Sequence, residues 1–397
     1  MIANEEKDRV WKAYRDRKGV PNRDMSRLGS PPVRVPISLA VNPRVVVLDP
    51  KWNPRGITFE EYFHNASATV EVQLAFMRYQ REYLNQYCDA PTGRASEWTF
   101  YVDKQNVYDA AYFGCPVVFR DGQVSDATPI LDGPNKEKVF SLDLDHPLDN
   151  PFIRKCLDLC EALKKAVAKL PADGIAYKVA PVLCNFDGTL TVSACLRGTE
   201  IFSDLYEDPD YVKRLFAFIH RGAEIRNRAL AKLAGQKAFD GNVGGLADDS
   251  IQLISTATYR EHVMPFHRDW LSKWSVAGPH GMHLCGDATR HFRTLRDELN
   301  VYSFDTGFPV DHGRLRRELG PDVEILGGPE VSILLNGTPQ QVYERTKGIL
   351  LSGIKEGGRF ILKEANNLPP CCPEANLAAF YKAGLEFGGY NDNNKQG

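Results

Sequence analysis

Short apolar runs alternate with longer amphipathic segments along most of this chain. The short runs are rich in β-branched and aromatic residues, a composition that predicts buried strands. Eight strands are predicted in this way, at residues 33–40, 96–103, 175–185, 237–243, 281–286, 301–305, 323–328 and 359–366.

Amphipathic helices are predicted between these runs. Apolar residues recur every three or four positions at residues 59–84, 208–234, 250–274 and 338–358. Pro265 is expected to kink or divide the third of these helices. The fourth begins with Thr338, which suits an N-cap, and Pro339, which suits the first helical position.

The order of these elements predicts the fold class. Strands that alternate with helices predict right-handed β–α–β units and a parallel sheet. Eight such strands predict an α/β protein with a single (β/α)8 TIM barrel over residues 31–397, after a helical N-terminal extension at residues 1–30. The irregular stretch from 107 to 170 predicts an inserted hairpin and helix. An open, doubly wound sheet is the competing arrangement, although no G-x-G-x-x-G motif follows an early strand to support its dinucleotide-binding version.

Composition and charge narrow the classes of function. The 397 residues are 43% hydrophobic and 25% charged, as in ordinary soluble globular proteins. A net charge of −2 and a pI near 6.5 leave no basic surface for nucleic acid. The charged N-terminus and the lack of a long apolar window predict a cytoplasmic protein. The nine cysteines are irregularly spaced, which argues against a disulfide framework.

Polar side chains follow almost every predicted strand. In a barrel, the carboxyl ends of the strands and the loops after them form one mouth, where active sites lie. An aspartate at such a position can alternatively cap the next helix, a reading that applies to Asp249, Asp287 and Asp305. The catalytic candidates are Asp103, Asp248 and Glu364, and the substrate-binding candidates are Asn42, Tyr101, Asp187, Asp305, Glu330 and Asn366.

His283 and Cys285 are the candidate metal ligands. They lie two residues apart in G-M-H-L-C-G-D-A (281–288), within the fifth predicted strand. Side chains two positions apart on a strand share one face, so the imidazole and the thiol should lie together. This donor pair favours zinc over magnesium or calcium, which prefer oxygen ligands. Packing without function is the alternative.

A catalytic zinc site needs a third protein ligand. Glu364, at the end of the eighth predicted strand, could supply a carboxylate oxygen. Cys371 and Cys372 follow in P-P-C-C-P and could reach the site only if their loop folds back. Their alternative role is in a loop that enters the next helix.

Several phrases of the sequence are specific to one superfamily. LLNGTPQQV, GGRFIL and LPPCCPEANLAAF are the most specific, and HLCGDATRHF and FDTGF precede them. YDAAYFGCPVVF and LYEDPDYVKRLF fit the same pattern more loosely. Over residues 90–390 the chain thereby resembles the uroporphyrinogen decarboxylase superfamily. The resemblance implies a single (β/α)8 barrel, in agreement with the predicted strand count.

Within this superfamily the chain is more similar to the corrinoid-linked methyltransferases than to the decarboxylases. Decarboxylases carry an arginine-rich N-terminal signature that binds porphyrinogen carboxylates, and SPPVRVPISLAVNPRVV (30–46) lacks it. In the methyltransferases, which include coenzyme M methyltransferases and O-demethylase components, a His-x-Cys pair and a later cysteine hold zinc. His283 and Cys285 match the pair, but Asn366 stands at the position of the later cysteine. The resemblance therefore implies that another residue completes the site or that zinc is not bound.

The implied function is zinc-assisted methyl transfer between a small methylated or methoxylated molecule and a corrinoid carried by a partner protein. Asp103 or Asp248 would handle protons, and a homodimer is implied because members of the superfamily are often dimers. Two alternatives stay open. One is a metal-free decarboxylase or lyase that acts on a carboxylated substrate, and the other is a barrel that binds a tetrapyrrole without catalysis.

Overall fold

The computed structural model describes residues 2–16, 33–91, 96–171, 174–183, 186–239, 245–274 and 280–390. It contains two compact units. Unit 1 comprises Met1–Pro54, Leu74–Ala95 and Gly278–Gly397, and unit 2 comprises Arg55–Gln73 and Ser96–Ala277. Both contain helices and parallel strands, which confirms the predicted α/β class.

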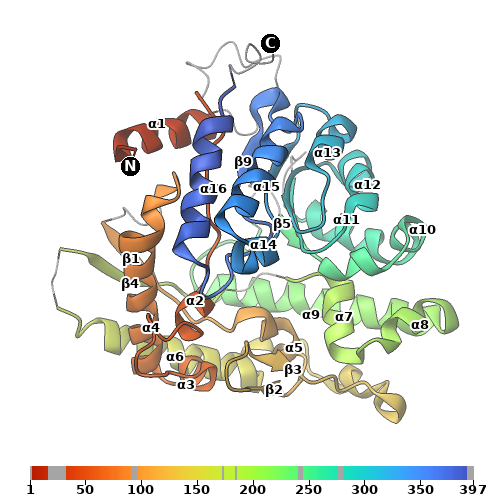
Figure 1. Ribbon diagram of the computed structural model, residues 1–397. Coiled ribbons are helices and arrows are strands. Elements are labelled where there is room, and N and C mark those ends of the chain that lie inside the picture. The colour runs from red at the N-terminus through yellow and green to blue at the C-terminus, as the bar shows by residue number, and fades with distance from the viewer. Residues whose placement is uncertain are drawn as a thin grey trace. The chain divides into compact units, whose positions relative to one another are not determined.

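Four neighbouring parallel strands form the centre of unit 1 (Figure 1). They are β6 (His280–Leu284), β7 (Val301–Thr306), β8 (Glu324–Gly327) and β9 (Phe360–Leu362). All four fall within or beside the last four predicted strands. Their apolar side chains are largely buried, as expected of parallel strands that are covered on both faces.

The segment predicted as the first strand, residues 33–40, lies beside β9 but forms no regular strand. Ile37 makes an isolated parallel bridge to Leu362, supported by hydrogen bonds from Ser38 N to Leu362 O (2.8 Å) and from Leu362 N to Pro36 O (3.0 Å). Pro36 has no N–H to donate, so the pairing cannot extend as a full ladder. The prediction was right in position and wrong in extent.

Helices connect and cover the strands of unit 1, and α15 and α16 run side by side next to β9 (Figure 1). Thr338 forms a capping box with Gln341 at the start of α15, with Pro339 in the first turn as predicted. The helix ends at Leu351, earlier than the predicted 358, before Gly353, which has a φ of 93°. The helices are α1 (Asn4–Arg15), α2 (Arg44–Val47), α12 (Thr289–Leu299), α13 (His312–Leu319), α14 (Val331–Asn336), α15 (Pro339–Leu351) and α16 (Glu374–Phe387).

A buried arginine joins the ends of several of these elements. The guanidinium group of Arg316, on α13, donates to the carbonyl oxygens of Ile354, Gly320, Val323 and Arg359 at distances of 2.7–3.1 Å. Its side chain is only 1% exposed. Burial lowers the pKa of Arg316 to about 10, so the charge persists at neutral pH.

Unit 2 contains two parallel strands, a hairpin and one further short strand. β1 (Glu97–Phe100) pairs in parallel with β4 (Ala176–Val179), while β2 (Val117–Val118) and β3 (Asp126–Ala127) form the predicted inserted hairpin. The predicted strand at 237–243 is not seen at 237–239, and residues 240–243 lie outside the described residues. A strand, β5 (Gly245–Ala247), follows directly after them.

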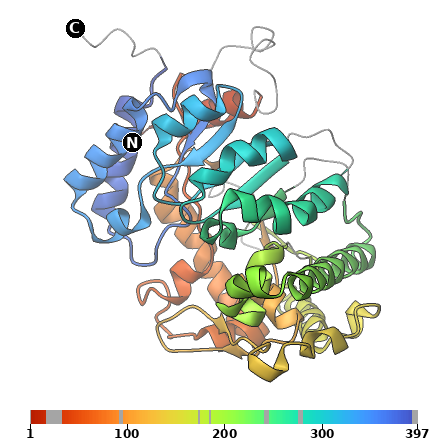
Figure 2. The ribbon, with the colours of Figure 1, turned by 90° about the vertical axis from the view of Figure 1, so that its right-hand side faces the viewer.

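The helix predicted at 208–234 is confirmed as the continuous α9 (Pro209–Leu233), whereas two other predicted long helices are divided where polar residues or proline interrupt them. The helix predicted at 59–84 breaks at Asn65, whose side chain accepts hydrogen bonds from Ser67 N and Ala68 N. The helix predicted at 250–274 becomes short turns before α11, with Pro265 in the first turn of α11. The α-helices are α3 (Phe59–His64), α4 (Ala66–Arg78, which begins in unit 2), α5 (Tyr108–Tyr112), α6 (Pro151–Val167), α7 (Thr189–Arg197), α8 (Glu200–Glu207), α9 (Pro209–Leu233), α10 (Thr256–Thr258) and α11 (Met264–Ser272). Figure 2 gives a second view of these elements.

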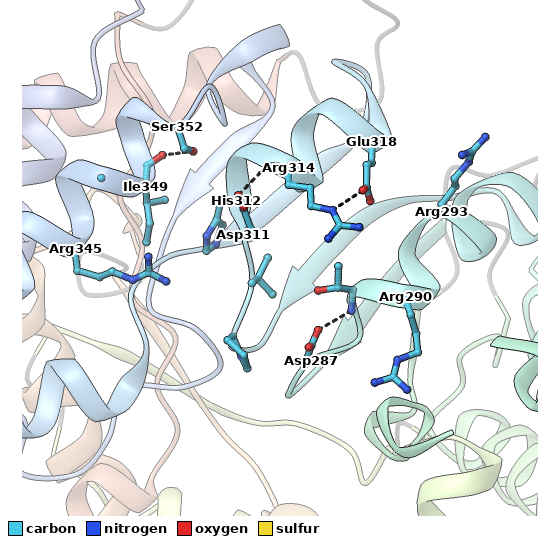
Figure 3. A pocket seen from close by; sticks show the side chains of 14 residues that line it. Asp287, Arg290, Arg293, Asp311, His312, Arg314, Glu318, Arg345, Ile349 and Ser352 are labelled. Carbon is cyan, nitrogen blue, oxygen red and sulfur yellow. Dashed lines mark hydrogen bonds and ion pairs between the residues drawn. The ribbon is translucent and has the colours of Figure 1, made fainter. Parts of the chain in front are cut away.

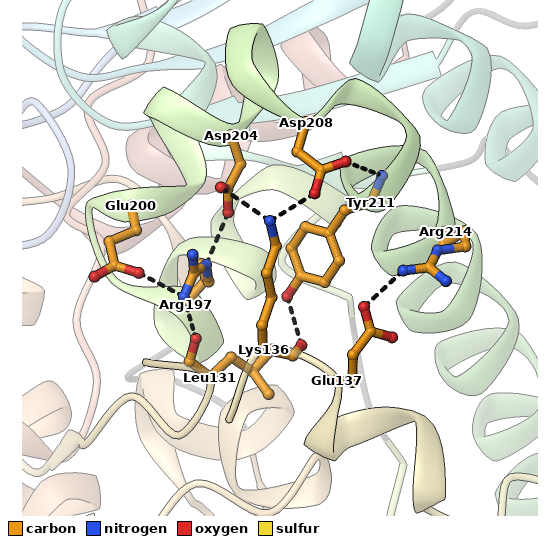
Figure 4. Close-up of polar contacts among 9 residues, drawn as sticks. All are labelled: Leu131, Lys136, Glu137, Arg197, Glu200, Asp204, Asp208, Tyr211 and Arg214. Carbon is orange, nitrogen blue, oxygen red and sulfur yellow. Dashed lines mark hydrogen bonds and ion pairs between the residues drawn. The ribbon is translucent and has the colours of Figure 1, made fainter. Parts of the chain in front are cut away.

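A charged network fastens the irregular segment 131–137 to α8 and α9 (Figure 4). Lys136 contacts Asp204 (3.3 Å) and Asp208 (2.8 Å), and Arg197 donates to Asp204 (2.8 Å). Tyr211 donates its hydroxyl to Lys136 O at 2.9 Å. These contacts explain how this segment, with its short 3-10 helix Gly133–Asn135, is held against α8 and α9.

The eight cysteines among the described residues are free thiols. Cys156 and Cys160 are buried on α6, as their helical spacing predicts. Within the described ranges, no helix combines the length and the apolar character needed to cross a bilayer.

Arg316→Met should lower the free energy of unfolding by roughly 3 kcal/mol, because four buried carbonyl groups lose a charged donor. Arg317→Met, at the neighbouring exposed position, should change it by less than about 0.5 kcal/mol. Urea denaturation of both variants measures the difference. Equal effects would contradict the role given to Arg316.

Candidate functional site

The candidate site of unit 1 lies at the carboxyl end of β6. The parallel register places His283 opposite Asp305 of β7. His283 and Cys285 share one face, as predicted, and the imidazole Nε2 lies 3.1 Å from the Cys285 Sγ. Both residues are half-buried, and the His283 side chain keeps 33% of its surface exposed. A ligand can therefore approach the pair from solvent.

Asp305 holds the other nitrogen of the imidazole. Its Oδ2 lies 2.8 Å from His283 Nδ1, and its Oδ1 accepts a hydrogen bond from Lys363 Nζ at 2.6 Å. Burial tends to raise the pKa of Asp305, but the hydrogen bond from His283 and the charge of Lys363 outweigh it and hold the pKa below its usual value. Asp305 is thus an ionised acceptor, and both of its oxygens are occupied.

Glu364 is fully buried next to this group. Its carboxyl oxygens accept hydrogen bonds from Ala40 N at 3.1 and 3.2 Å, which ties the site to the segment beside β9. Burial raises the pKa of Glu364 to about 8, although the charge of Lys363 opposes the shift. The carboxyl group therefore carries a proton at neutral pH.

The third metal ligand expected from the sequence does not accompany the pair. Among the described residues, the three candidates Glu364, Cys371 and Cys372 bring no ligand atom within 4.8 Å of both donors. The Cys371 thiol is exposed and contacts Leu48 O, and the buried Cys372 thiol contacts Leu334 O.

The remaining candidates of unit 1 make local contacts. The side chain of Asn42 accepts a hydrogen bond from Arg44 N at the start of α2. Glu330 binds Arg345 through both oxygens, at 2.5 and 2.8 Å. Burial would raise the pKa of Glu330, but this ion pair lowers it. Asn366 has a φ of 86°, a conformation that asparagine adopts more readily than most residues.

Tyr101 and Asp103 lie directly after β1 in unit 2. Asp103 accepts hydrogen bonds from the Tyr62 hydroxyl (3.0 Å) and from Gln105 N (2.8 Å). The buried Gln73 binds the backbone N–H and carbonyl of Tyr101. Burial and the charge of Asp103 raise the pKa of the Tyr101 hydroxyl, which therefore stays protonated.

Asp248 is a buried hub of unit 2. Its oxygens accept hydrogen bonds from Leu190 N, from both N and Oγ1 of Thr191, and from His267 Nε2, at 2.7–3.1 Å. His267 in turn contacts the Tyr259 hydroxyl. With its side chain fully buried, Asp248 holds the start of α7, and the catalytic role expected for it stays a prediction.

Asp187 lies between β4 and α7, shortly before α7 begins. Its backbone N–H donates to Asp109 Oδ2 at 3.0 Å, and Arg226 binds the other oxygen of Asp109 at 2.6 Å. Burial, followed by the negative charge of Asp109, raises the pKa of Asp187 well above its usual value. The sequence analysis missed Asp109 and Arg226.

A separate cavity of about 910 Å³ in unit 1 is lined by α12, α13 and α15 (Figure 3). Arg290, Arg293, Arg314 and Arg345 lie around it. None of the predicted site residues lines it, and Glu330 is linked to it only through Arg345. The candidate site is placed instead at the end of β6, where the two predicted metal ligands lie.

The loop after β7 packs directly on the end of β6. A Cβ added to Gly307 would lie 2.2 Å from Gly286 N and 2.6 Å from the carbonyl carbon of Cys285. Any side chain at position 307 would therefore displace the backbone that carries the thiol.

Gly307→Ala should reduce the free energy of unfolding by about 1–3 kcal/mol through this overlap. It should also change the rate at which iodoacetamide alkylates Cys285. Gly281→Ala is the matched control, because its added Cβ meets nothing closer than 3.8 Å. Denaturation and peptide mass spectrometry measure both effects, and identical behaviour of the two variants would refute the close packing.

Glu364 predicts a specific pH dependence of stability. Its folded pKa of about 8 exceeds the ordinary 4.5, so the protonated carboxyl stabilises the fold fully below about pH 4.5, and this contribution is lost as the pH rises to about 8. Glu364→Gln removes the titration. Urea denaturation between pH 5 and pH 8 should show the variant gaining stability relative to wild type, whereas the exposed Glu356→Gln should not. A difference that is constant with pH would contradict the assignment.

Comparisons with known proteins bear on the identity of the chain. Residues 107–387 match the protein family described as uroporphyrinogen decarboxylase (URO-D). Two curated relatives come from Methanosarcina mazei. A methylated-thiol–coenzyme M methyltransferase is 37% identical over 208 residues, which cover 51% of this chain and 52% of that protein. A methylcobamide:CoM methyltransferase is 24% identical over 279 residues, which cover 68% of this chain and 74% of that protein.

The match to the first relative thus spans about half of its length. Among solved structures, a methyltransferase from Methanosarcina mazei has a TM-score of 0.58 at 17% identity, with 90% of this chain and 96% of that one covered. This likeness concerns the fold alone. The family match covers most of the chain, and the chain therefore belongs to the uroporphyrinogen decarboxylase family.

Proposed function

We propose that this protein is a methyltransferase that moves a methyl group between a small methylated or methoxylated molecule and a corrinoid carried by a partner protein. The contact between His283 and Cys285 carries the proposal, because it offers two donors on one partly exposed face. The relatives named as coenzyme M methyltransferases support this reaction class. A closed (β/α)8 barrel is proposed with it, since the segment at Ile37 pairs with β9 as a first strand pairs with the last.

The donor set fits zinc in part. An imidazole nitrogen and a thiol are both ligands that zinc prefers, and Asp305 already orients the imidazole. His283 and Cys285 would hold the ion, which leaves other positions for a further ligand and for substrate. Bound zinc would supply Lewis-acid polarisation or lower the pKa of a bound thiol. The corrinoid would supply the cobalt that carries the methyl group.

The chain's own residues would orient groups and handle protons. Glu364 carries a proton at neutral pH and can donate it within the buried part of the site. Asp103 and Asp248 stay proposed as further proton-handling groups. Asn42, Tyr101, Asp187, Asp305, Glu330 and Asn366 stay proposed as substrate-binding residues, with Asp305 acting mainly on His283. The cytoplasmic location and the homodimer stay predictions.

Zinc content and methyl transfer test the proposal together. Purified protein should contain about one zinc per chain, since a catalytic site holds a single ion. It should also demethylate methylcobalamin in the presence of a thiol acceptor, or methylate cob(I)alamin from methylated thiols, methoxyaromatics, methylamines or methanol. The absorbance change of the corrinoid follows both reactions.

His283→Ala and Cys285→Ala should each lower zinc affinity and methyl transfer by about 100-fold or more, because each removes a metal donor. Cys195→Ala is the matched control, since Cys195 is half-buried like Cys285 but lies on α7. A wild-type protein without zinc that transfers no methyl group would overturn the proposal. Decarboxylation of a carboxylated substrate, or tetrapyrrole binding without turnover, would then identify an alternative.

A further inference from the structure

A chain of four side chains links the carboxyl ends of β6, β7 and β9 in unit 1, and β8 lies between β7 and β9 in the sheet. It runs from Lys363, after β9, to Asp305 on β7, then to His283 on β6 and finally to Cys285. The three contacts measure 2.6, 2.8 and 3.1 Å in that order. From the sequence, Asp305 was predicted to bind substrate, and Lys363 was not among the predicted site residues.

The donors and acceptors in this chain determine the tautomer of His283. A carboxylate can only accept hydrogen bonds, so Asp305 Oδ2 requires a proton on His283 Nδ1. In the neutral ring, Nε2 is then an acceptor, and it faces the sulfur of Cys285. The lone pair on Nε2 is therefore directed toward the Cys285 sulfur.

Lys363 fixes Asp305 from the opposite side. Its side chain is only 4% exposed, and its ammonium group is bound to Asp305 Oδ1. The backbone of Lys363 is itself held, because Lys363 N donates to Gly327 O at 3.0 Å and its carbonyl packs against Gly328. A Cβ on Gly328 would lie 1.9 Å from that carbonyl oxygen. The ammonium group thus reaches Asp305 from a rigid position.

We propose that Asp305 and Lys363 are positioning residues. They hold the His283 ring so that its Nε2 lone pair points at the metal ion that His283 and Cys285 would bind together. This inference deepens the proposed function and rests on it where zinc is concerned. Asp305 orients the ring, and Lys363 holds the carboxylate in place. Carboxylate partners of metal-bound histidines typically change metal affinity by about 10–100-fold when removed.

Zinc affinity of the full-length protein tests the metal-binding part. Asp305→Asn and Lys363→Met should each weaken zinc binding by about 10–100-fold in competition with a chromophoric chelator. Asp311→Asn, which removes a helix-capping carboxylate on α13, and Lys355→Met, which removes an ammonium bound to the carbonyls of Phe387 and Gly389, are matched controls and should bind zinc as wild type does. If Lys363→Met fails to fold, the double variant with Asp305→Asn removes both charges and should show the same loss.

The tautomer of His283 in the metal-free protein gives a second readout, which does not depend on zinc. Nitrogen-15 NMR of histidine-labelled protein, with the His283 signal identified by its loss in His283→Gln, should show the proton on Nδ1. Asp305→Asn and the double variant should shift this signal toward a mixture of tautomers, while Asp311→Asn should not. Unchanged histidine signals with unchanged zinc affinity would overturn the inference. If wild type binds no zinc, the metal part of the proposed function fails, and the NMR result alone decides the positioning role.

Discussion

The parallel register of β6 and β7 is the constraint on which the candidate site depends. It sets His283 opposite Asp305, so that the imidazole meets a carboxylate on one side and the Cys285 sulfur on the other. A slip of one residue would turn His283 to the opposite face of the sheet. The apolar side chains of β6 and β7 oppose such a slip, because it would expose Met282 and Phe304, which are now buried. The packing of the core thereby determines which side chains meet at the candidate site.

Several buried acids among the described residues are bound by cations or by N–H and O–H donors, and this distinguishes them from the buried acids whose pKa is raised. Asp248 accepts hydrogen bonds from four donors. Glu330 forms an ion pair with Arg345, and Asp305 contacts both His283 and Lys363. Glu364 and Asp187 differ, because burial raises the pKa of each carboxyl group toward neutral pH. Acids of this kind are suited to exchanging protons, whereas the paired ones are suited to holding other groups in place.

Much of the fold could be predicted from the sequence because its signals are local. β6 to β9 are short apolar runs, and the two-residue spacing of His283 and Cys285 placed them correctly on one face. Residues 33–40 were over-predicted as a strand, since the effect of Pro36 on pairing depends on which neighbour the segment meets. Of the fourth predicted strand, 237–243, only residues 237–239 are described; they form no strand, and β5 begins at Gly245.

The parts of the site that were missed depend on contacts between distant segments. Lys363 is one more polar residue in RFILKEAN, and only the pairing of β9 with β8, and of β8 with β7, brings it to Asp305. The available signal in the sequence was a charged residue directly after three apolar ones. Arg226 and Asp109 are 117 positions apart, and no local pattern pairs them.

In the proposed function, the end of β6 presents an imidazole nitrogen and a thiolate to one metal ion. X-ray absorption spectroscopy at the zinc edge of the zinc-loaded protein measures this directly. We expect one sulfur scatterer at about 2.3 Å from zinc, together with imidazole nitrogen at about 2.0 Å from zinc. A shell of oxygen and nitrogen without sulfur, in protein whose Cys285 is intact, would contradict it.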